Sequence, residues 1–446
     1  MQTRASGEQP PRGGWRFLLR ALGHRNYRLF FAGQSVSLVG TWLTRVATSW
    51  LVYRLTGSAM LLGVISFCGQ IPTFLLGPFA GVLVDRWNRH RLLVVTQVLA
   101  MIQSLALAAL ALTGVIAVWH IAALMVFQGL INAFDMPGRQ SFVVEMVEDR
   151  ADLPNAIALN SSMFNAARLL GPSVAGALIA LVGEGGCFLI DGISYLAVIG
   201  SLLAMRITPR PRVQRHQHVL TELKEGFQHT FHFPPMRALL GLVALVSLMG
   251  MPLTVLMPVM ASQVLGGGAN TLGFLMAAAG LGALGGAGFL ASRRSVRGLG
   301  GVILVTTLLF GAGLLAFSLS RHLALSLVSL VLTGFGMMVT TAASNTVLQT
   351  IVEERMRGRL MSFYTMSVMG TAPFGSLLGG TLATHLGAPT TLAINGAMCL
   401  VGAVWFWRKL PELRERVRPI YVRLGIIPEV ATGMDMAAER PGPREV

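Results

Sequence analysis

Long apolar stretches recur along the whole of this 446-residue chain. Each holds about twenty mainly apolar residues, enough to cross the hydrocarbon core of a bilayer as an α-helix. Lipid requires every backbone polar group to be bonded internally, and the alternating pattern typical of a membrane β-barrel is absent. The sequence therefore predicts an all-α membrane protein with twelve transmembrane helices, at residues 29–52, 59–83, 92–114, 118–137, 155–181, 187–205, 238–262, 271–291, 299–319, 323–346, 361–385 and 389–407.

The composition agrees with a membrane protein. Hydrophobic residues make up 53% of the chain and charged residues only 12%, whereas an ordinary soluble protein carries about 25% charged residues. The three cysteines, Cys68, Cys187 and Cys399, all fall in apolar spans. We expect them to be packing residues, because they form neither a disulfide framework nor a metal-ligand spacing. The sequence thus predicts no cofactor and no metal site.

Positive charge is concentrated on one side of the predicted membrane. The formal net charge is +16, and with residues 1–28 in the cytoplasm, all but four of the 35 lysines and arginines fall in cytoplasmic segments. This positive-inside bias predicts that both termini lie in the cytoplasm, and it accounts for the basic charge without a nucleic-acid partner. Residues 1–28 lack the apolar core and cleavage site of a removable signal peptide.

The longest internal loop separates the first six predicted spans from the last six. It begins as a basic run at 206–218 and then places Leu220, Leu223, Phe227 and Phe231 at helical spacing. That spacing predicts an amphipathic helix on the cytoplasmic surface. The expected organisation is a cytoplasmic N-terminal segment, a six-helix bundle, the linker, a second six-helix bundle and a cytoplasmic tail, at residues 1–28, 29–205, 206–237, 238–407 and 408–446.

A short repeat relates the two halves. Residues 147–150 read Val-Glu-Asp-Arg and residues 352–355 read Val-Glu-Glu-Arg, and each copy joins the fourth predicted span of its half to the fifth. The two copies therefore have the same orientation, as in parallel transporter repeats that bind substrate near the bilayer midplane. We predict two pseudo-symmetric bundles around a central site.

Residues 81–91, between the second and third spans, combine a glycine, an aspartate and several basic side chains. A carboxylate beside cations at a helix end can hold neighbouring helices together through charge-assisted hydrogen bonds. The alternative is ordinary basic flanking of a span. The predicted gate residues of this stretch are Gly81, Asp85, Arg86, Arg89 and Arg91.

This stretch resembles the loop signature of the major facilitator superfamily, which runs Gly-x-x-x-Asp-Arg-x-Gly-x-basic-basic. Asn88 stands at the second glycine, a mild departure because asparagine also tolerates a left-handed turn. The corresponding stretch at 286–297 lacks the aspartate, so any lock there is expected to be weaker. The resemblance covers roughly residues 25–410 and implies two six-helix bundles that rock about a central site.

A second motif lies in the fifth span, where Gly171 and Pro172 are followed by Gly176. Proline removes a helix hydrogen bond and glycines permit close helix contact, so these three are also predicted gate residues. A packing kink is the alternative. The stretch resembles the Gly-Pro-x-x-Gly-Gly signature on the fifth helix of drug–proton antiporters, with Ala175 at the first glycine of the closing pair. The resemblance implies export.

Several shorter phrases are similar to the branch that includes bacterial siderophore exporters and macrolide efflux pumps. Each phrase is weak alone, and together they do not fix the substrate. They occur at Leu55–Ser58, Arg139–Gln140, Asn155–Ala156, Cys187–Asp191 and Arg357–Arg359.

Polar side chains form stripes at helical spacing within the spans, and two arginines lie at bilayer depth. An ionised arginine there costs about 2.5–3.5 kcal/mol, so it should face protein or water. For the glutamine, asparagine and threonine side chains of these stripes, hydrogen bonding between helices is an equal alternative to substrate contact. For Arg45 the alternatives are an ion pair with Asp135 or a carbonyl clamp, and for Arg168 a structural role beside the proline. The predicted substrate-binding residues are Arg45, Gln128, Asn132, Asn165, Arg168 and Asn345.

Two carboxylates, Asp135 and Asp191, are the predicted proton-coupling residues. The alternative for Asp135 is a helix-end pair with Arg139, four residues later. Asp191 falls near the outer end of the sixth span, a peripheral helix by the resemblance, which favours a structural role. The first span has no central acidic residue, although some drug antiporters carry one there.

These features, together with the resemblance, predict a monomeric secondary transporter of the bacterial inner membrane that exports an amphipathic small molecule, such as a drug or siderophore, in exchange for protons. No nucleophile–base set or nucleotide-binding segment is recognisable, so an enzyme is not expected. Two alternatives stay open, nutrient uptake and a non-transporting membrane sensor or scaffold. Drug accumulation in cells with and without the protein separates export from uptake, and flux in liposomes separates transport from scaffolding.

Overall fold

The structure, a computed structural model, describes residues 19–147, 149–206, 232–293 and 295–427. The amphipathic helix predicted in the linker lies outside these residues. Within them the chain is almost entirely helical and forms no strand. The all-α class is therefore confirmed for the described part of the chain.

The helices fall into two sets, one on each side of the linker. The first set is α2 (Arg25–Thr56), α3 (Ala59–Arg86), α4 (Arg89–Leu112), α5 (Val118–Met146) and α6 (Leu153–Leu203). The second set is α8 (Pro234–Val259), α9 (Ala269–Ser292), α10 (Leu299–Leu319), α11 (Leu323–Ile351), α12 (Arg357–Thr365), α13 (Ala372–Leu386) and α14 (Ala388–Arg423). Two π-helical turns, η3 (Met260–Val264) and η5 (Met366–Gly370), extend α8 and join α12 to α13.

Nine helices of the described residues are long and apolar enough to cross a membrane. α2 is not among them, because its polar residues lower its mean hydropathy. The label α6 covers both predicted spans, 155–181 and 187–205, and the chain leaves helical geometry between them at Gly183, with φ 71° and ψ 176°. Only glycine adopts such a positive φ readily. The count of twelve spans stays a prediction.

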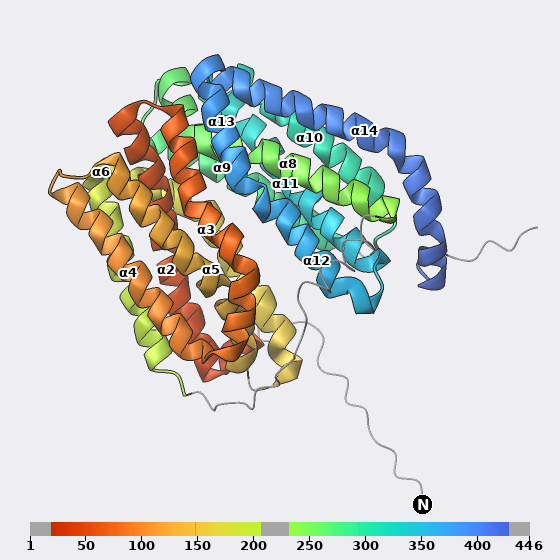
Figure 1. The fold of residues 1–446 in the computed structure, drawn as a ribbon, viewed down its shortest axis with the longest axis horizontal. Coiled ribbons are helices and arrows are strands. Elements are labelled where there is room, and N and C mark those ends of the chain that lie inside the picture. Colours follow the sequence, from red (N-terminus) through yellow and green to blue (C-terminus); the bar gives the residue numbers. More distant parts are fainter. Residues whose placement is uncertain (1–18, 148, 207–231, 294, 428–446) are drawn as a thin grey trace, which may run out of the picture.

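The two sets of helices lie side by side, in contact at one end and apart at the other (Figure 1). The most extensive contacts between them join α6 to α9 and α3 to α13. The contact end carries the turns at Gly57 and Gly387, and the opposite end carries the basic stretch at 81–91. By the positive-inside rule, the halves touch at the predicted outer end and part at the predicted cytoplasmic end.

Glycines make the contacts between the halves possible. A Cβ atom on Gly176 of α6 would lie 2.8 Å from the Ala269 carbonyl oxygen and 3.1 Å from the Gly273 Cα of α9. A Cβ atom on Gly63 of α3 would lie 3.0 Å from the Gly380 Cα of α13. Backbone lies against backbone at both places, so a larger residue would push the halves apart.

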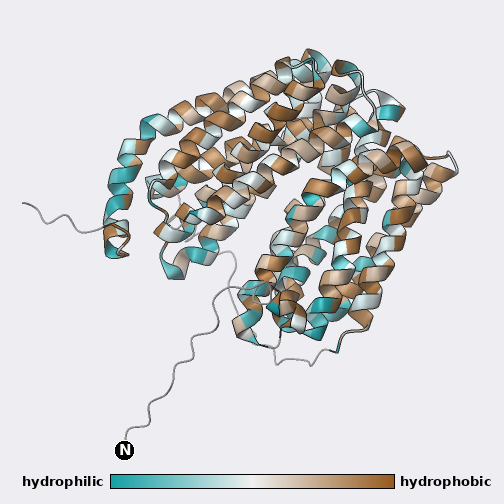
Figure 2. Ribbon diagram, turned by 180° about the vertical axis from the view of Figure 1, so that it is seen from behind, coloured by the Kyte–Doolittle hydropathy of each residue, from teal (hydrophilic) through white to brown (hydrophobic). Residues whose placement is uncertain are grey.

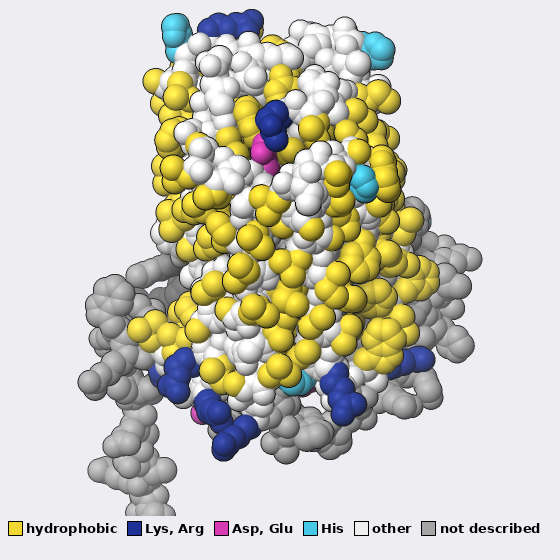
Figure 3. All heavy atoms as spheres, turned by 90° about the vertical axis from the view of Figure 1, so that its left-hand side faces the viewer, with side chains coloured by type: hydrophobic (Ala, Val, Ile, Leu, Met, Phe, Trp, Pro, Cys, Tyr) yellow, Lys and Arg dark blue, Asp and Glu magenta, His cyan; other side chains and the backbone are white. Residues whose placement is uncertain are grey.

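The outer surface is that of a chain embedded in lipid. Figure 3 shows a broad hydrophobic band between two polar ends, with arginine and lysine side chains along its lower edge. Many large apolar side chains of the described residues are exposed, for example Leu181 at 80% and Phe79 at 69%. A water-soluble protein rarely exposes so continuous an apolar surface.

The last helix runs past the predicted end of its span. α14 continues to Arg423, so residues 408–423 of the predicted tail are helical, and its final turns are hydrophilic (Figure 2). Leu413 and Val417 are buried against the C-terminal half. On the exposed side, a hydrogen bond from Lys409 and the charge of Arg416 hold the pKa of Glu412 below its ordinary value.

Candidate functional site

A cavity of about 780 Å³ lies between the two halves. Its lining from α2, α4, α5 and α6 is largely polar, whereas α8 and α9 contribute Met251, Val255 and Met276. Near the basic end the lining residues, such as Gln34 and Gln140, come from the N-terminal half alone. The cavity therefore opens toward the basic end and is bounded by both halves farther in. Its volume suits a small-molecule ligand.

Arg45 is central to this cavity. It lies in the middle of α2, lines the cavity, and its side chain is exposed there rather than buried. Its guanidinium lies over the ring of Trp42, with 4.8 Å between Cζ and the ring centroid. The alternative ion pair with Asp135 is not formed, because Asp135 binds Arg139. The described residues offer Arg45 no carboxylate partner.

Arg168 lies on α6, where its backbone contacts α9 of the other half. Its backbone carbonyl would be 2.9 Å from a Cβ atom on Gly280 of α9. The positive charge of Arg168 is near enough to Arg45 for the two guanidinium groups to repel one another. Its side chain is half-buried and is not part of the cavity lining.

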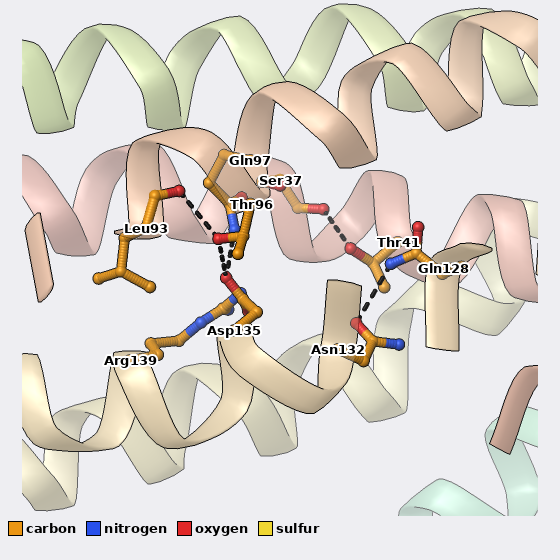
Figure 4. A network of polar contacts seen from close by, with 9 residues as sticks. All are labelled: Ser37, Thr41, Leu93, Thr96, Gln97, Gln128, Asn132, Asp135 and Arg139. Carbon is orange, nitrogen blue, oxygen red and sulfur yellow. Dashed lines mark hydrogen bonds and ion pairs between the residues drawn. The ribbon is translucent and has the colours of Figure 1, made fainter. Parts of the chain in front are cut away.

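The predicted amides divide into two groups. Gln128, Asn132 and Asn165 line the cavity. Gln128 donates to the Asn132 side chain at 3.2 Å, on the same face of α5 (Figure 4), and its own Oε1 has no hydrogen-bond partner among the described residues. Asn345 lies away from the cavity lining and accepts a hydrogen bond from Gln349 at 2.9 Å.

Asp135 is fully engaged by its neighbours (Figure 4). Its Oδ1 accepts hydrogen bonds from the Thr96 hydroxyl and the Gln97 amide of α4, each at 2.8 Å. Its Oδ2 forms an ion pair with Arg139, one turn along α5. The Asp135–Arg139 pair, which the four-residue spacing suggested as the alternative to proton coupling, is therefore present. Arg139 neutralises Asp135, and this network ties α4 to α5 inside the N-terminal half.

The Asp135–Arg139 pair gives a direct stability prediction. The two side chains are only 7% and 17% exposed, so removing one charge leaves the other uncompensated. We expect Asp135→Asn and Arg139→Gln each to lower the free energy of unfolding by about 3–5 kcal/mol. Thermal unfolding of the purified protein should show that the double variant loses less than the sum of the two single variants. Strict additivity would contradict the pairing. As a control, Lys409→Gln, at an exposed pair, should change stability by at most about 1 kcal/mol.

Asp191 is buried without a cation. It is 1% exposed, and its Oδ2 accepts hydrogen bonds from Thr44 at 2.6 Å and Ser104 at 2.9 Å. Its Oδ1 has no hydrogen-bond partner among the described residues and lies against Gly40, where a Cβ atom would be 2.5 Å away. An ionised carboxylate is costly in such a place, and a bound proton removes the charge. Asp191 also borders the cavity.

The gate stretch at 81–91 joins α3 to α4. Arg89 forms an ion pair with Glu145 of α5 at 2.7 Å, and Gly81 and Arg86 lie in the last turns of α3. Asn88 is not left-handed, with φ −72°; instead its side chain caps α4 by accepting from the Arg91 backbone at 3.1 Å. The side chain of Asp85 lies outside the described part of the structure.

The second motif lies at helix contacts. A Cβ atom on Gly171 would be 2.6 Å from Cγ of Trp42, so α6 lies directly against α2 there. The Pro172 carbonyl oxygen would be 2.6 Å from a Cβ atom on Gly273 of α9. α6 remains helical through the proline, and its non-helical residue is Gly183. The motif therefore brings α6 close to α2 in its own half and to α9 in the other half.

The residues that hold the two carboxylates were not predicted from the sequence. Thr44, Ser104, Thr96 and Gln97 lie in apolar spans, and no sequence pattern paired them with a carboxylate. Glu145 was not predicted as the partner of Arg89 either, and the predicted span 118–137 ended before it, whereas α5 continues to Met146. Their partners come from other helices, and no local pattern specifies those.

Comparison with known proteins is consistent with this architecture. Residues 19–423 match the family described as transmembrane secretion effector. The chain belongs to this family of major facilitator transporters. Its members are multi-pass membrane transporters and not enzymes.

Relatives of the transmembrane secretion effector family align over most of their length. The staphyloferrin A transporter of Staphylococcus aureus is 24% identical over 87% of this chain and 97% of its own. The multidrug efflux pump Tap of Mycolicibacterium fortuitum is 26% identical over 84% and 93%. The enterobactin exporter EntS of Escherichia coli is 27% identical over 88% and 93%.

Solved structures share the fold. A bacterial homologue of the human lysosomal transporter Spinster, in an inward-facing and unoccupied conformation, superposes with a TM-score of 0.67. It is 16% identical and covers 91% of this chain and 99% of its own. At this identity the likeness concerns the fold alone.

Proposed function

We propose that this chain exports an amphipathic small molecule, such as a drug or siderophore, across the bacterial inner membrane in exchange for protons. The observation that carries the proposal is the cavity, which opens toward the basic end and is closed at the other end by contacts between the halves. A binding space accessible from one side at a time is what alternating access requires. Two of the relatives, a multidrug efflux pump and an enterobactin exporter, work in the same direction.

In this mechanism the substrate enters from the cytoplasm and binds beside Arg45, Gln128, Asn132 and Asn165. The halves then rock, the α6–α9 and α3–α13 contacts open, and the substrate leaves on the outside. The stretch at 81–91 helps to close the cytoplasmic end, with Arg89 and Glu145 holding α4 to α5. Both termini lie in the cytoplasm and the protein works as a monomer.

Proton coupling is assigned to Asp191 rather than to Asp135. Asp135 already has a cation, Arg139, so it has no need of a proton. Asp191 has no cation partner among the described residues and borders the cavity, so loading and release of its proton would change the charge of the cavity wall. A bound proton that favours one conformation over the other biases the cycle by that difference in affinity.

The test is transport in a defined membrane. The purified chain is placed in liposomes with its cytoplasmic face outward, the lumen is made acidic, and a chemically diverse panel of labelled amphiphiles is added outside. We expect at least one compound to accumulate in the lumen, and a protonophore to abolish the accumulation. Accumulation only with the opposite orientation would favour uptake. A folded protein that moves no member of the panel in either direction would favour the sensor or scaffold.

A further inference from the structure

The accessible charge in the cavity is positive. Three charged groups besides Arg45 border it, Asp135, Arg139 and Asp191. Arg139 and Asp135 neutralise each other, and Asp191 is 1% exposed and held behind α2 by hydroxyl groups of Thr44 and Ser104. Among the described residues that line the cavity, Arg45 alone presents an exposed, unpaired charge to the cavity space.

Arg45 is held in place by an aromatic ring rather than by an anion. The Trp42 ring lies under its guanidinium, and the backbone of α6 at Gly171 lies against the same ring. Stacking on a ring leaves the edge of a guanidinium, with its N–H groups, free to donate to a planar oxyanion. The fold therefore fixes the position of the guanidinium without consuming its hydrogen bonds.

Arg168 adds a second positive charge to the same region. It lies one turn before Gly171 on α6, as Arg45 lies one turn after Trp42 on α2, and the two guanidinium groups repel each other. Two like charges at bilayer depth are unfavourable in an empty site, and an anion bound to Arg45 in the cavity relieves the repulsion. The backbone of Arg168 touches α9, so its surroundings change when the halves separate.

We infer that the substrates of this cavity are anions, namely small molecules that join a carboxylate or similar oxyanion to an apolar body. Arg45 binds the oxyanion, Arg168 strengthens the local positive potential, and the apolar body lies against Met251, Val255 and Met276 of the C-terminal half. This inference rests on the proposed transport function and adds the charge of the cargo to it. Cationic amphiphiles are disfavoured.

The inference is tested by equilibrium binding to the purified full-length chain in detergent. The probes are two matched series that differ only in one polar group: naphthylacetate, naphthylacetamide and naphthylethylammonium, and pyrenebutyrate, its amide and pyrenebutylammonium. We expect at least one carboxylate to bind about tenfold more tightly than its carboxamide, as a charge-assisted hydrogen bond implies. The ammonium compounds should bind most weakly.

Variants assign the preference to the arginines. Arg45→Gln should remove the carboxylate preference, Arg45→Lys should keep part of it as evidence that the site remains folded, and Arg168→Gln should reduce it a few-fold. Arg321→Gln, at an exposed arginine on the opposite side of the membrane from the basic loops, is the matched control and should change nothing.

The inference is overturned if in neither series the carboxylate binds more tightly than its carboxamide, or if Arg45→Gln keeps the preference. Binding needs no gradient, so the two proposals can fail separately. Carboxylate preference through Arg45 without any gradient-driven flux supports the anion site and rejects the transport proposal. Proton-coupled flux of a cation or neutral compound, with no carboxylate preference, supports transport and rejects the anion site.

Discussion

Asp191→Asn is expected to abolish proton-driven accumulation while leaving substrate binding intact. Asparagine has the shape of the protonated acid and can still accept hydrogen bonds from Thr44 and Ser104, but it cannot release a proton. The variant should therefore still exchange labelled for unlabelled substrate across liposomes without a pH gradient. With an acidic lumen, the substrate should only equilibrate, whereas the parent protein concentrates it.

Two controls make this result specific to Asp191. Glu353→Gln removes an exposed carboxylate at the basic end and should leave accumulation unchanged. Asp191→Glu keeps the ionisable group, and it should retain part of the coupling if the pocket accepts one more methylene. Undiminished concentration of substrate by Asp191→Asn would show that the coupling proton is carried elsewhere.

Gly273→Leu is expected to hold the two halves apart at their contact end and to stop transport. A Cβ atom at this position would be 2.6 Å from the Pro172 carbonyl oxygen and 3.1 Å from the Gly176 Cα. Backbone atoms cannot move aside as a flexible side chain does, and overpacking of this kind costs about 1–3 kcal/mol or more. This cost falls on the conformation closed at that end, so its population should drop by about tenfold to a hundredfold.

Labelling reports the change of conformation. Ser49, which lines the cavity, is replaced by cysteine in a background without Cys68, Cys187 and Cys399. An impermeant maleimide added from the outside should label it faster in Gly273→Leu than in the parent. Gly288→Leu is the matched control on the same helix, because no atom lies within 4 Å of its Cβ position. Unchanged labelling together with normal flux would show that this contact does not close the outer end.

Helix positions were largely predictable from the sequence, because lipid imposes both the length and the apolar character of a span. The predicted span 299–319 coincides with α10, and 323–346 begins where α11 begins. The predicted ends of the helices were less accurate. A helix that continues beyond the membrane into water can be polar, so hydropathy does not mark where it ends. α11 and α14 both continue beyond their predicted ends for this reason. The two predicted spans within α6 are separated by a break in helical geometry at Gly183, whose backbone conformation hydropathy does not report.

The sequence was sufficient to predict which helix faces are polar, but not which residues those faces contact. Helical spacing marked the polar side of α2, α5 and α6, and Arg45, Gln128, Asn132 and Asn165 do line the cavity. Spacing cannot tell which neighbour a face meets, and the polar stripe that contains Asn345 lies apart from the cavity. The partners of Asp191 are 147 and 87 residues away in the chain. Such distant pairings are set by the packing of whole helices.

The contact end of the molecule is held by backbone atoms and neutral groups. Gly176 lies on Gly273, Gly63 lies on Gly380, and Ser66 donates a hydrogen bond to Ser376 at 3.1 Å. Dissolved ions screen interactions between charges over about 8–10 Å, and these contacts join no charged side chains across the two halves. The closure of this end should consequently be insensitive to the ionic strength of the surrounding solution.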